Sequence, residues 1–173
     1  MKPLSPADRT HVQAAEGWLD LGNHVEANAE LENLAPANRA HPDLLQVRWR
    51  VYAKAGKWAA CLDIATSLTQ MTPRRRFGWV HRAISLDRLQ RPAEAKELLL
   101  SAVEKLGPCS TFAFHLACVC ARLGQLVEAK RWVKQAIGLA QDRATLDRLR
   151  LRVLDEPALE EFWRQVGDLG DEG

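Results

Sequence analysis

The 173-residue sequence has few of the features that would indicate a membrane protein or a secreted one. It contains no run near the ~18–20 consecutive apolar residues that a membrane-spanning helix needs. The N-terminal residues Met1–Pro6 lack the apolar core of a secretory signal. We therefore expect a cytoplasmic protein that makes no contact with a membrane.

Charge of one sign is also scarce. Lysine and arginine total 24 and acidic residues total 22, so the formal net charge is only +2, and the two signs are interleaved along the chain. A nucleic-acid-binding surface normally needs a basic excess. The six tryptophans do not supply a base-stacking platform, because most of them fall on positions where helices pack together. We expect no nucleic acid among the partners.

The four cysteines make no pattern that binds metal or forms a redox pair. Cys61, Cys109, Cys118 and Cys120 include no CxxC pair and no Cys/His set with zinc spacing. His115 and Cys118 are three residues apart, but no third group is placed to orient them as a nucleophilic pair. The sequence also lacks a P-loop, a dinucleotide fingerprint, a nucleophile elbow and an HExxH motif. We expect no enzyme, no metal and no cofactor.

A short phrase recurs through the chain at a constant interval. Gly22-Asn23-His24-Val25-Glu26-Ala27 returns as Gly124-Gln125-Leu126-Val127-Glu128-Ala129, with related segments beginning at Gly56 and Gln90. The first residues are 22, 56, 90 and 124, so the interval is 34 residues each time. A fixed period of this size is typical of helical-repeat proteins. The predicted units are 8–41, 42–75, 76–109 and 110–143.

Each unit contains two stretches with helical periodicity, separated by a turn. The second stretch has a small residue at the same position in every unit, which lets two helices approach closely. These residues are Ala27, Cys61, Ala95 and Ala129. Before the first unit, Ser5-Pro6-Ala7-Asp8 provides a serine cap, a proline at the first helical position and an acid at the third. The pattern predicts an all-α protein.

These positions resemble the tetratricopeptide repeat (TPR) family, in particular its small stand-alone bacterial members. The matching residues are Trp79 at the fourth position, Gly56 and Gly124 at the turn, Glu94-Ala95 and Glu128-Ala129 after the turn, and Pro73 at the end of a repeat. The resemblance implies a right-handed superhelical α-solenoid of four 34-residue helix-turn-helix repeats with C-terminal capping helices. Five residues depart from the family pattern. Trp49 occupies a position for a small residue, Gln90 replaces a turn glycine, and the terminal proline is replaced by Arg39, Gly107 and Gln141.

The residues after the fourth repeat are expected to close the array. Helical periodicity continues over 144–154, and a short final helix is predicted at 158–166. A terminal repeat needs such a cover because its apolar side has no further neighbour. We expect one domain over 1–167, with the cap at 144–167 and a disordered acidic tail at 168–173.

The resemblance also implies a site, because the first helices of this family line a concave groove that holds ligands. Within the groove, Arg50, Lys54, Arg88, Arg122, Arg148 and Arg152 form a predicted basic track, and Phe77, Val80, Ile84 and Phe114 form a predicted apolar patch. The remaining predicted groove residues are Arg9, Gln13, Gln46, His81 and His115. The expected function is a non-catalytic scaffold or adaptor. Its expected partner is a protein or peptide segment, acidic and with an apolar anchor.

Two other functions are compatible with the same residues. A secretion or assembly chaperone would use the apolar patch to shield a client segment. A self-associating structural module would pair the patch with that of a second copy, which would make a homodimer. The sequence does not distinguish these alternatives, because fold alone does not specify function.

Overall fold

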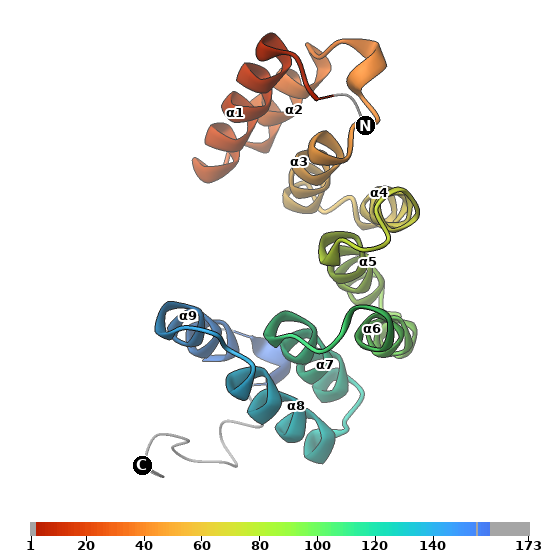
Figure 1. The fold of residues 1–173 in the computed structure, drawn as a ribbon, viewed down its shortest axis with the longest axis vertical. Coiled ribbons are helices and arrows are strands. Elements are labelled where there is room, and N and C mark those ends of the chain that lie inside the picture. Colours follow the sequence, from red (N-terminus) through yellow and green to blue (C-terminus); the bar gives the residue numbers. More distant parts are fainter. Residues whose placement is uncertain (1–2, 155, 160–173) are drawn as a thin grey trace. The chain divides into compact units, whose positions relative to one another are not determined.

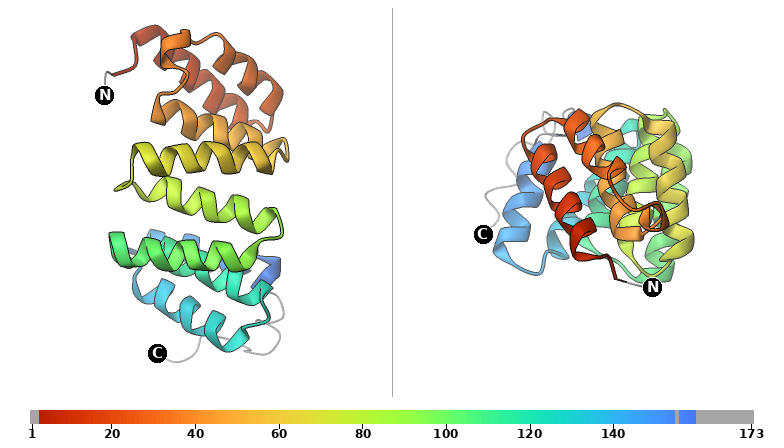
Figure 2. Two further views of the ribbon diagram at one scale, coloured as in Figure 1. Left: turned by 90° about the vertical axis from the view of Figure 1, so that its right-hand side faces the viewer. Right: turned by 90° about the horizontal axis from the view of Figure 1, so that it is seen from above.

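The computed structural model describes residues 3–154 and 156–159, and this part of the chain is helical without any strand. Figure 1 shows the helices in chain order. The helices are α1 (Pro6–Asp20), α2 (His24–Glu32), η1 (Pro36–Asn38, 3₁₀), α3 (Pro42–Lys54), α4 (Trp58–Met71), α5 (Arg76–Arg88), α6 (Pro92–Leu106), α7 (Ser110–Arg122), α8 (Leu126–Gly138), α9 (Arg143–Leu154) and η2 (Pro157–Leu159, 3₁₀). In the described residues, each predicted repeat thus contains two α-helices, and within a unit the two helices of a repeat pack together, α1 with α2, α3 with α4 and α7 with α8 (Figure 2).

The contacts between helices divide the chain into two compact units. Unit 1 spans Met1–Ser85 and unit 2 spans Leu86–Gly173, so the boundary falls inside α5. Unit 1 therefore holds the first two repeats and most of α5, whereas unit 2 holds α6 to η2.

The turn between the two helices of a repeat has the same hydrogen bonds every time. In the first repeat the N–H of Asn23 donates to the carbonyl of Trp18 (2.8 Å), and Gly22 donates to Leu19 (3.0 Å). This pair of bonds is a Schellman motif, which requires a left-handed residue just after the helix. The four left-handed residues are Gly22 (φ 79°), Gly56 (φ 70°), Gln90 (φ 62°) and Gly124 (φ 71°). The 34-residue interval in the sequence therefore marks this one backbone feature.

The start of α1 confirms the predicted cap. Ser5 Oγ accepts a hydrogen bond from the N–H of Asp8 (3.1 Å) and donates one to its carboxylate (2.6 Å). The Asp8 carboxylate also accepts from the Ala35 N–H (3.2 Å) and from Asn38 Nδ2 (2.7 Å). These bonds, led by the one from Ser5, lower the pKa of Asp8 below its ordinary value. One buried carboxylate thus ties the first turn of α1 to the segment that follows α2.

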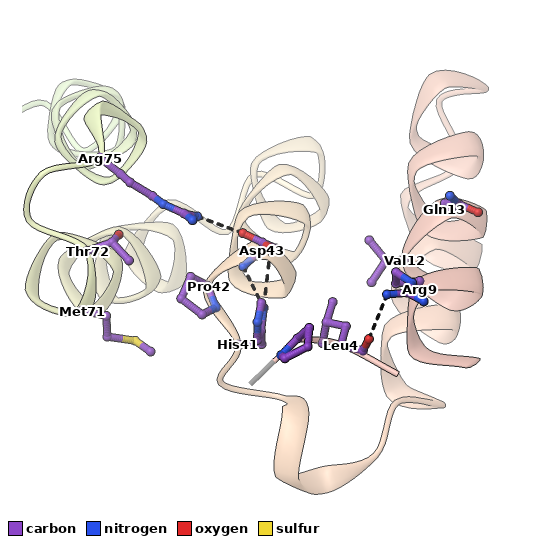
Figure 3. A pocket seen from close by; sticks show the side chains of 11 residues that line it. Leu4, Arg9, Val12, Gln13, His41, Pro42, Asp43, Met71, Thr72 and Arg75 are labelled. Carbon is purple, nitrogen blue, oxygen red and sulfur yellow. Dashed lines mark hydrogen bonds and ion pairs between the residues drawn. The ribbon is translucent and has the colours of Figure 1, made fainter. Parts of the chain in front are cut away.

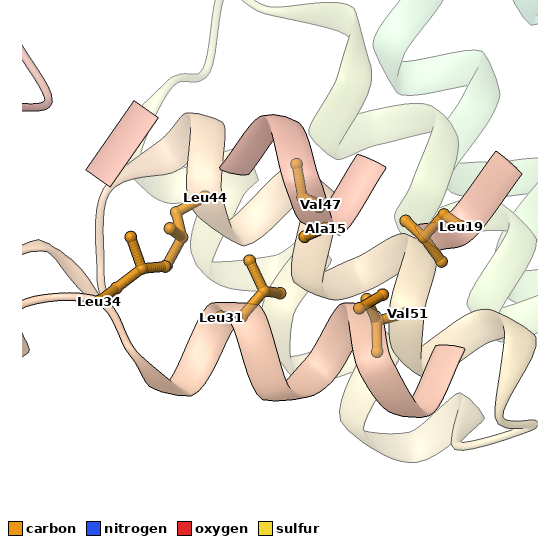
Figure 4. Close-up of a cluster of buried hydrophobic side chains, with 8 residues drawn as sticks. Ala15, Leu19, Leu31, Leu34, Leu44, Val47 and Val51 are labelled. Carbon is orange, nitrogen blue, oxygen red and sulfur yellow. The ribbon is translucent and has the colours of Figure 1, made fainter. Parts of the chain in front are cut away.

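The core of unit 1 lies between α1, α2 and α3 (Figure 4). Its members come from the faces of the three helices at helical spacing: Ala15, Leu19, Ala27, Leu31, Leu34, Leu44, Val47 and Val51. The two alanines let α1 and α2 approach closely, and the larger side chains fill the space beside them. This arrangement agrees with the role predicted for the small residue of the second helix.

Trp49 is accommodated although its position usually holds a small residue. It is 6% exposed and packs with the small side chains of Cys61 and Ala65. Its indole Nε1–H donates to Ser85 Oγ (3.1 Å), and that hydroxyl donates to the carbonyl of His81 (2.8 Å). The indole therefore has both the space and the hydrogen-bond partner that a buried tryptophan needs.

Unit 2 is closed by residues after the fourth repeat. The predicted helix at 144–154 is observed as α9, Arg143–Leu154. α9 packs against α8, and η2 packs against α7 and α9. Of the predicted helix at 158–166, the structure describes residues 158 and 159, which belong to the 3₁₀ turn η2. Residues 160–166 and the predicted tail 168–173 lie outside the described residues.

Candidate functional site

The predicted groove residues of unit 1 lie mainly on α1 and α3. Among them, Arg9, Gln13 and Lys54 are exposed, whereas Gln46 and Arg50 are partly exposed. We refer to the surface formed by these five residues as the α1–α3 face. A pocket lies toward each end of this face.

The first pocket, of about 690 Å³, lies at the N-terminal ends of α1 and α3 (Figure 3). Two arginines reach it from opposite sides, and both are already hydrogen-bonded: Arg9 Nη1 to the carbonyl of Leu4 (3.3 Å) and Arg75 Nη1 to Asp43 Oδ1 (3.0 Å). The lining residues are Pro3, Leu4, Arg9, Val12, Gln13, His41, Pro42, Asp43, Met71, Thr72 and Arg75. The pocket combines apolar side chains with polar groups at its rim, as many ligand pockets do.

The second pocket, of about 540 Å³, lies toward the C-terminal ends of the same two helices. The partly exposed Trp58 contributes aromatic surface above the buried Trp49, and Lys54 contributes a cation. The full lining is Leu19, Asp20, Trp49, Arg50, Ala53, Lys54 and Trp58. Lys54 is exposed and makes no ion pair within residues 3–154 and 156–159. This pocket therefore offers a basic group beside apolar surface.

Arg50, one residue of the predicted basic track, is neutralised by two carboxylates of this chain. Arg50 Nη1 is 3.2 Å from Glu16 Oε1, and its Nη2 is 3.5 Å from Asp20 Oδ1. An arginine held by two carboxylates presents little net charge to a ligand. Lys54 thus carries more of the available positive charge at this end of the face than Arg50 does.

The predicted apolar patch is not a continuous exposed surface in unit 1. Val80 is only 5% exposed and belongs to the core. Phe77 and Ile84 are partly buried, and the Phe77 ring stacks on His81 with centroids 3.6 Å apart. His81 in turn meets Trp49 edge-on at 4.1 Å and donates from Nδ1 to the Phe77 carbonyl (2.9 Å). These aromatic side chains support the core of unit 1 rather than forming an open apolar surface.

The predicted residues of unit 2 are mostly engaged within the chain. Phe114 is 2% exposed, and the Arg152 guanidinium lies over its ring at 4.2 Å. Arg152 Nη2 also lies 3.3 Å from Nε2 of the partly exposed His115. Arg88 is exposed, and the side chain of Arg148 lies outside the described residues. Phe114 therefore does not offer the apolar anchor surface that the sequence suggested.

Arg122 joins two carboxylates of unit 2. Its Nη1 is 2.7 Å from Asp87 Oδ2, and its Nη2 is 2.8 Å from Glu156 Oε1. Burial raises the pKa of Asp87 above its ordinary value, although Arg122 opposes this effect. Like Arg50, Arg122 is occupied by acidic groups of its own chain.

The thiols are placed as structural side chains. Cys61, Cys118 and Cys120 are buried, and burial raises the pKa of the Cys61 and Cys120 thiols to about 11 and that of Cys118 further. A thiol held in its neutral form is a poor nucleophile. In the described part of the chain, no three His, Cys, Asp or Glu side chains come together in a way that could hold a metal ion. In the same described residues, no helix is long and apolar enough to span a bilayer.

Several pocket residues were not predicted from the sequence. His41, Met71 and Arg75 line the first pocket, and Trp58 lines the second. Projecting only the first helix of each repeat misses Met71, Arg75 and Trp58, because they come from α4 and from the connection to α5. Pro42 and Asp43 mark the start of α3 in the sequence, so they could have indicated that the first pocket lies at this end of the helix.

Comparison with known proteins identifies the fold but no close relative. No protein-family model matches the chain, and no curated protein matches it. Among solved structures, TTC0263, a thermophilic TPR protein of Thermus thermophilus, superposes with a TM-score of 0.70 at 21% identity, over 96% of this chain and 93% of that one. The 41-end fragment of MamA from Desulfovibrio magneticus RS-1 has a TM-score of 0.65 at 16% identity, over 94% of each chain. These likenesses confirm the all-α, tetratricopeptide-type fold that the 34-residue period predicted.

Proposed function

We propose that this protein is a non-catalytic binding module that holds an extended segment of another protein along the α1–α3 face. The observation that carries the proposal is the pair of pockets toward opposite ends of the same two helices, one of about 690 Å³ and one of about 540 Å³. A protein-binding role also suits the tetratricopeptide-type fold, although fold by itself does not assign a function.

The separation of the pockets sets the length of the bound segment. Asp43 lines the first pocket and Lys54 the second, and they lie near opposite ends of α3. At 1.5 Å per helical residue this is roughly 16 Å along the helix axis. An extended chain covers that distance with about five residues. The segment would place one apolar side chain in each pocket.

The charges of the face favour one acidic residue in the partner. Arg9, Arg50 and Arg75 are all engaged by groups of this chain, whereas Lys54 is exposed beside the Trp49–Trp58 surface. A carboxylate next to the second apolar anchor would pair with Lys54. The preferred ligand is therefore a mainly apolar segment with a single acid rather than a strongly acidic one.

The burial of Val80 and Phe114 removes support from the two alternative functions. A client chaperone or a self-associating module would use an exposed apolar patch that includes these side chains, and they are 5% and 2% exposed. No other large apolar surface in the described residues replaces them on the first helices.

Panning a random peptide display library against the full chain tests the proposal. We expect enriched peptides with two apolar residues about five positions apart and an acid beside one of them. Lys54→Glu should weaken their binding about tenfold, the factor that ~1.4 kcal/mol represents. Lys130→Glu makes the same charge change at an exposed position of α8 and should leave binding unchanged. Peptides that bind wild type and Lys54→Glu equally, or a library with no enrichment, would overturn the proposal.

A further inference from the structure

The chain leaves the repeat path after α9 and returns to the first helix of the fourth repeat. In a continuing array the next element would extend the layer of second helices. Here η2 instead packs against α7 and α9 within unit 2 (Figure 1). The segment Glu156–Leu159 therefore packs on α7.

A carboxylate anchors this segment at one point. Glu156 Oε1 accepts from Arg122 Nη2 (2.8 Å), while Arg122 Nη1 binds Asp87 Oδ2 (2.7 Å). The Glu156 side chain is 17% exposed and that of Arg122 is 25% exposed, so the contact is only partly screened by solvent. The arginine is fixed by Asp87 whether or not Glu156 is present, so it is oriented in advance for a carboxylate.

An apolar side chain anchors the segment three residues later. Leu159 is 0% exposed in the short η2 turn that packs on α7. Cys118 lies on the same helix between Phe114 and Arg122 and is 4% exposed. Cys118 precedes Arg122 by four residues, so the two side chains share one face of α7, and Arg122 carries the ion pair with Glu156. The acid and the leucine together cover this part of α7.

The covered surface retains one polar group that the segment does not satisfy. Asp87 Oδ1 is buried and has no hydrogen-bond partner among the described residues. A buried acceptor without a donor costs free energy. A ligand that supplied a donor at this point, in addition to the acid and the leucine, would bind this surface better than the chain's own segment does.

We propose that the α7 surface formed by Cys118 and Arg122 is a second binding surface, for a segment with a carboxylate followed three residues later by leucine. Glu156 and Leu159 occupy it as an intramolecular ligand. A short segment whose described contacts with α7 include an ion pair and a buried leucine should open at lower free energy than the helices beneath it. A protein segment of the same chemistry therefore competes for the surface by replacing Glu156–Leu159. This proposal concerns unit 2 alone and does not depend on the α1–α3 face.

Alkylation of Cys118 in the full-length protein reports whether this surface is covered. N-ethylmaleimide labelling is followed at each cysteine by tandem mass spectrometry. Glu156→Gln with Leu159→Ala should raise the labelling rate of Cys118 about tenfold or more, because it removes both anchors of the cover. Cys61 and Cys120, which are also buried, serve as internal controls and should stay protected. The matched variant, Glu104→Gln with Leu151→Ala, changes the same residue types at exposed positions and should label like wild type.

A peptide with the sequence of residues 153–161 then tests binding from outside the chain. It should restore protection of Cys118 in the Glu156→Gln, Leu159→Ala variant with a saturable concentration dependence. The same peptide with Gln for the glutamate at 156 and Ala for the leucine at 159 should not. Failure of the first peptide to protect Cys118 would overturn the second binding surface and leave the segment as a structural cap.

The labelling of Cys118 relative to Cys61 and Cys120 distinguishes uncovering of the α7 surface from unfolding. If the double variant exposes Cys61 and Cys120 together with Cys118, it has unfolded, and Leu159→Ala alone becomes the deciding variant, because it removes the apolar anchor and keeps the Glu156 charge that acts on the Cys118 thiol. Selective labelling of Cys118 in that variant supports the proposal. Equal labelling of Cys118 in Leu159→Ala and wild type contradicts it.

Discussion

The indole Nε1–H of Trp49 donates a hydrogen bond to Ser85 Oγ at 3.1 Å across thirty-six residues of sequence. Both side chains are buried, at 6% and 0% exposure. Trp49 occupies a position where this fold usually has a small residue, and the small Ser85 hydroxyl provides both room and an acceptor. The two residues therefore compensate for each other.

Removing the hydroxyl tests this compensation. Ser85→Ala should lower the free energy of unfolding by roughly 1–3 kcal/mol, because it leaves a buried N–H without an acceptor. Trp49→Phe should also destabilise, but the double variant should lose about 1 kcal/mol less than the sum of the single losses. Urea denaturation of the four proteins measures the coupling. Strictly additive losses would show that the bond contributes nothing.

Gln90 is the one described non-glycine residue with positive φ, at 62°. Gln90→Gly should raise the free energy of unfolding by about 0.5–1 kcal/mol, since relief of the left-handed strain exceeds the entropy that glycine costs. Gly56→Ala places a side chain at the equivalent position and should destabilise by about 1 kcal/mol. Thermal and chemical denaturation check both signs, and a stabilising Gly56→Ala would refute the explanation.

Gly78 lets α4 and α5 approach each other. A Cβ at this position would lie 2.8 Å from both the backbone nitrogen and Oγ1 of Thr69. Gly78→Ala should therefore destabilise by roughly 1–3 kcal/mol, because the contact is with backbone that cannot move aside easily. Gly17, in α1, has nothing within 4 Å of such a Cβ, so Gly17→Ala should stabilise by about 0.5–1 kcal/mol. We expect the denaturation midpoint to fall in Gly78→Ala and to rise in Gly17→Ala.

The carboxylate of Asp8 should make stability depend on pH. Its pKa is lowered in the folded protein, so its contribution is present above the ordinary value near ~4 and is lost as pH falls through the folded pKa. Wild type should melt above Asp8→Asn at pH 7, and the gap should narrow below about pH 4. Thermal melts across this range provide the measurement. Asp63→Asn removes the same charge from an exposed position of α4 and is the control. A gap that stays constant down to pH 3 would contradict the assignment.

The helical pairs could be predicted because their signals are local. The Schellman turns at Gly22, Gly56 and Gly124 depend on backbone conformations that glycine adopts readily, so their spacing is visible in the residues themselves. The Ser5–Asp8 cap was readable for the same reason, because its donor and acceptor are three residues apart. Even Gln90 did not disturb the prediction, since the three other turns established the period.

The candidate site was predicted less well because it depends on contacts between repeats. Arg9, Gln13 and Lys54 are exposed as expected, but Val80 and Phe114 are buried, and Arg50 has two carboxylate partners. A helical projection shows which direction a side chain takes. It does not show whether another helix or an acidic side chain already occupies the space there.

The sequence by itself therefore determined the helix pairs, their 34-residue period and the turn geometry, because each rests on residues close together in the chain. Only the tertiary structure decided which charges and apolar side chains remain available to a partner. The pairing of Arg50 with Glu16, and of Arg122 with Glu156, joins side chains one full repeat apart. Likewise, the return of η2 onto α7 depends on packing free energy rather than on periodicity, so the repeat pattern did not reveal it.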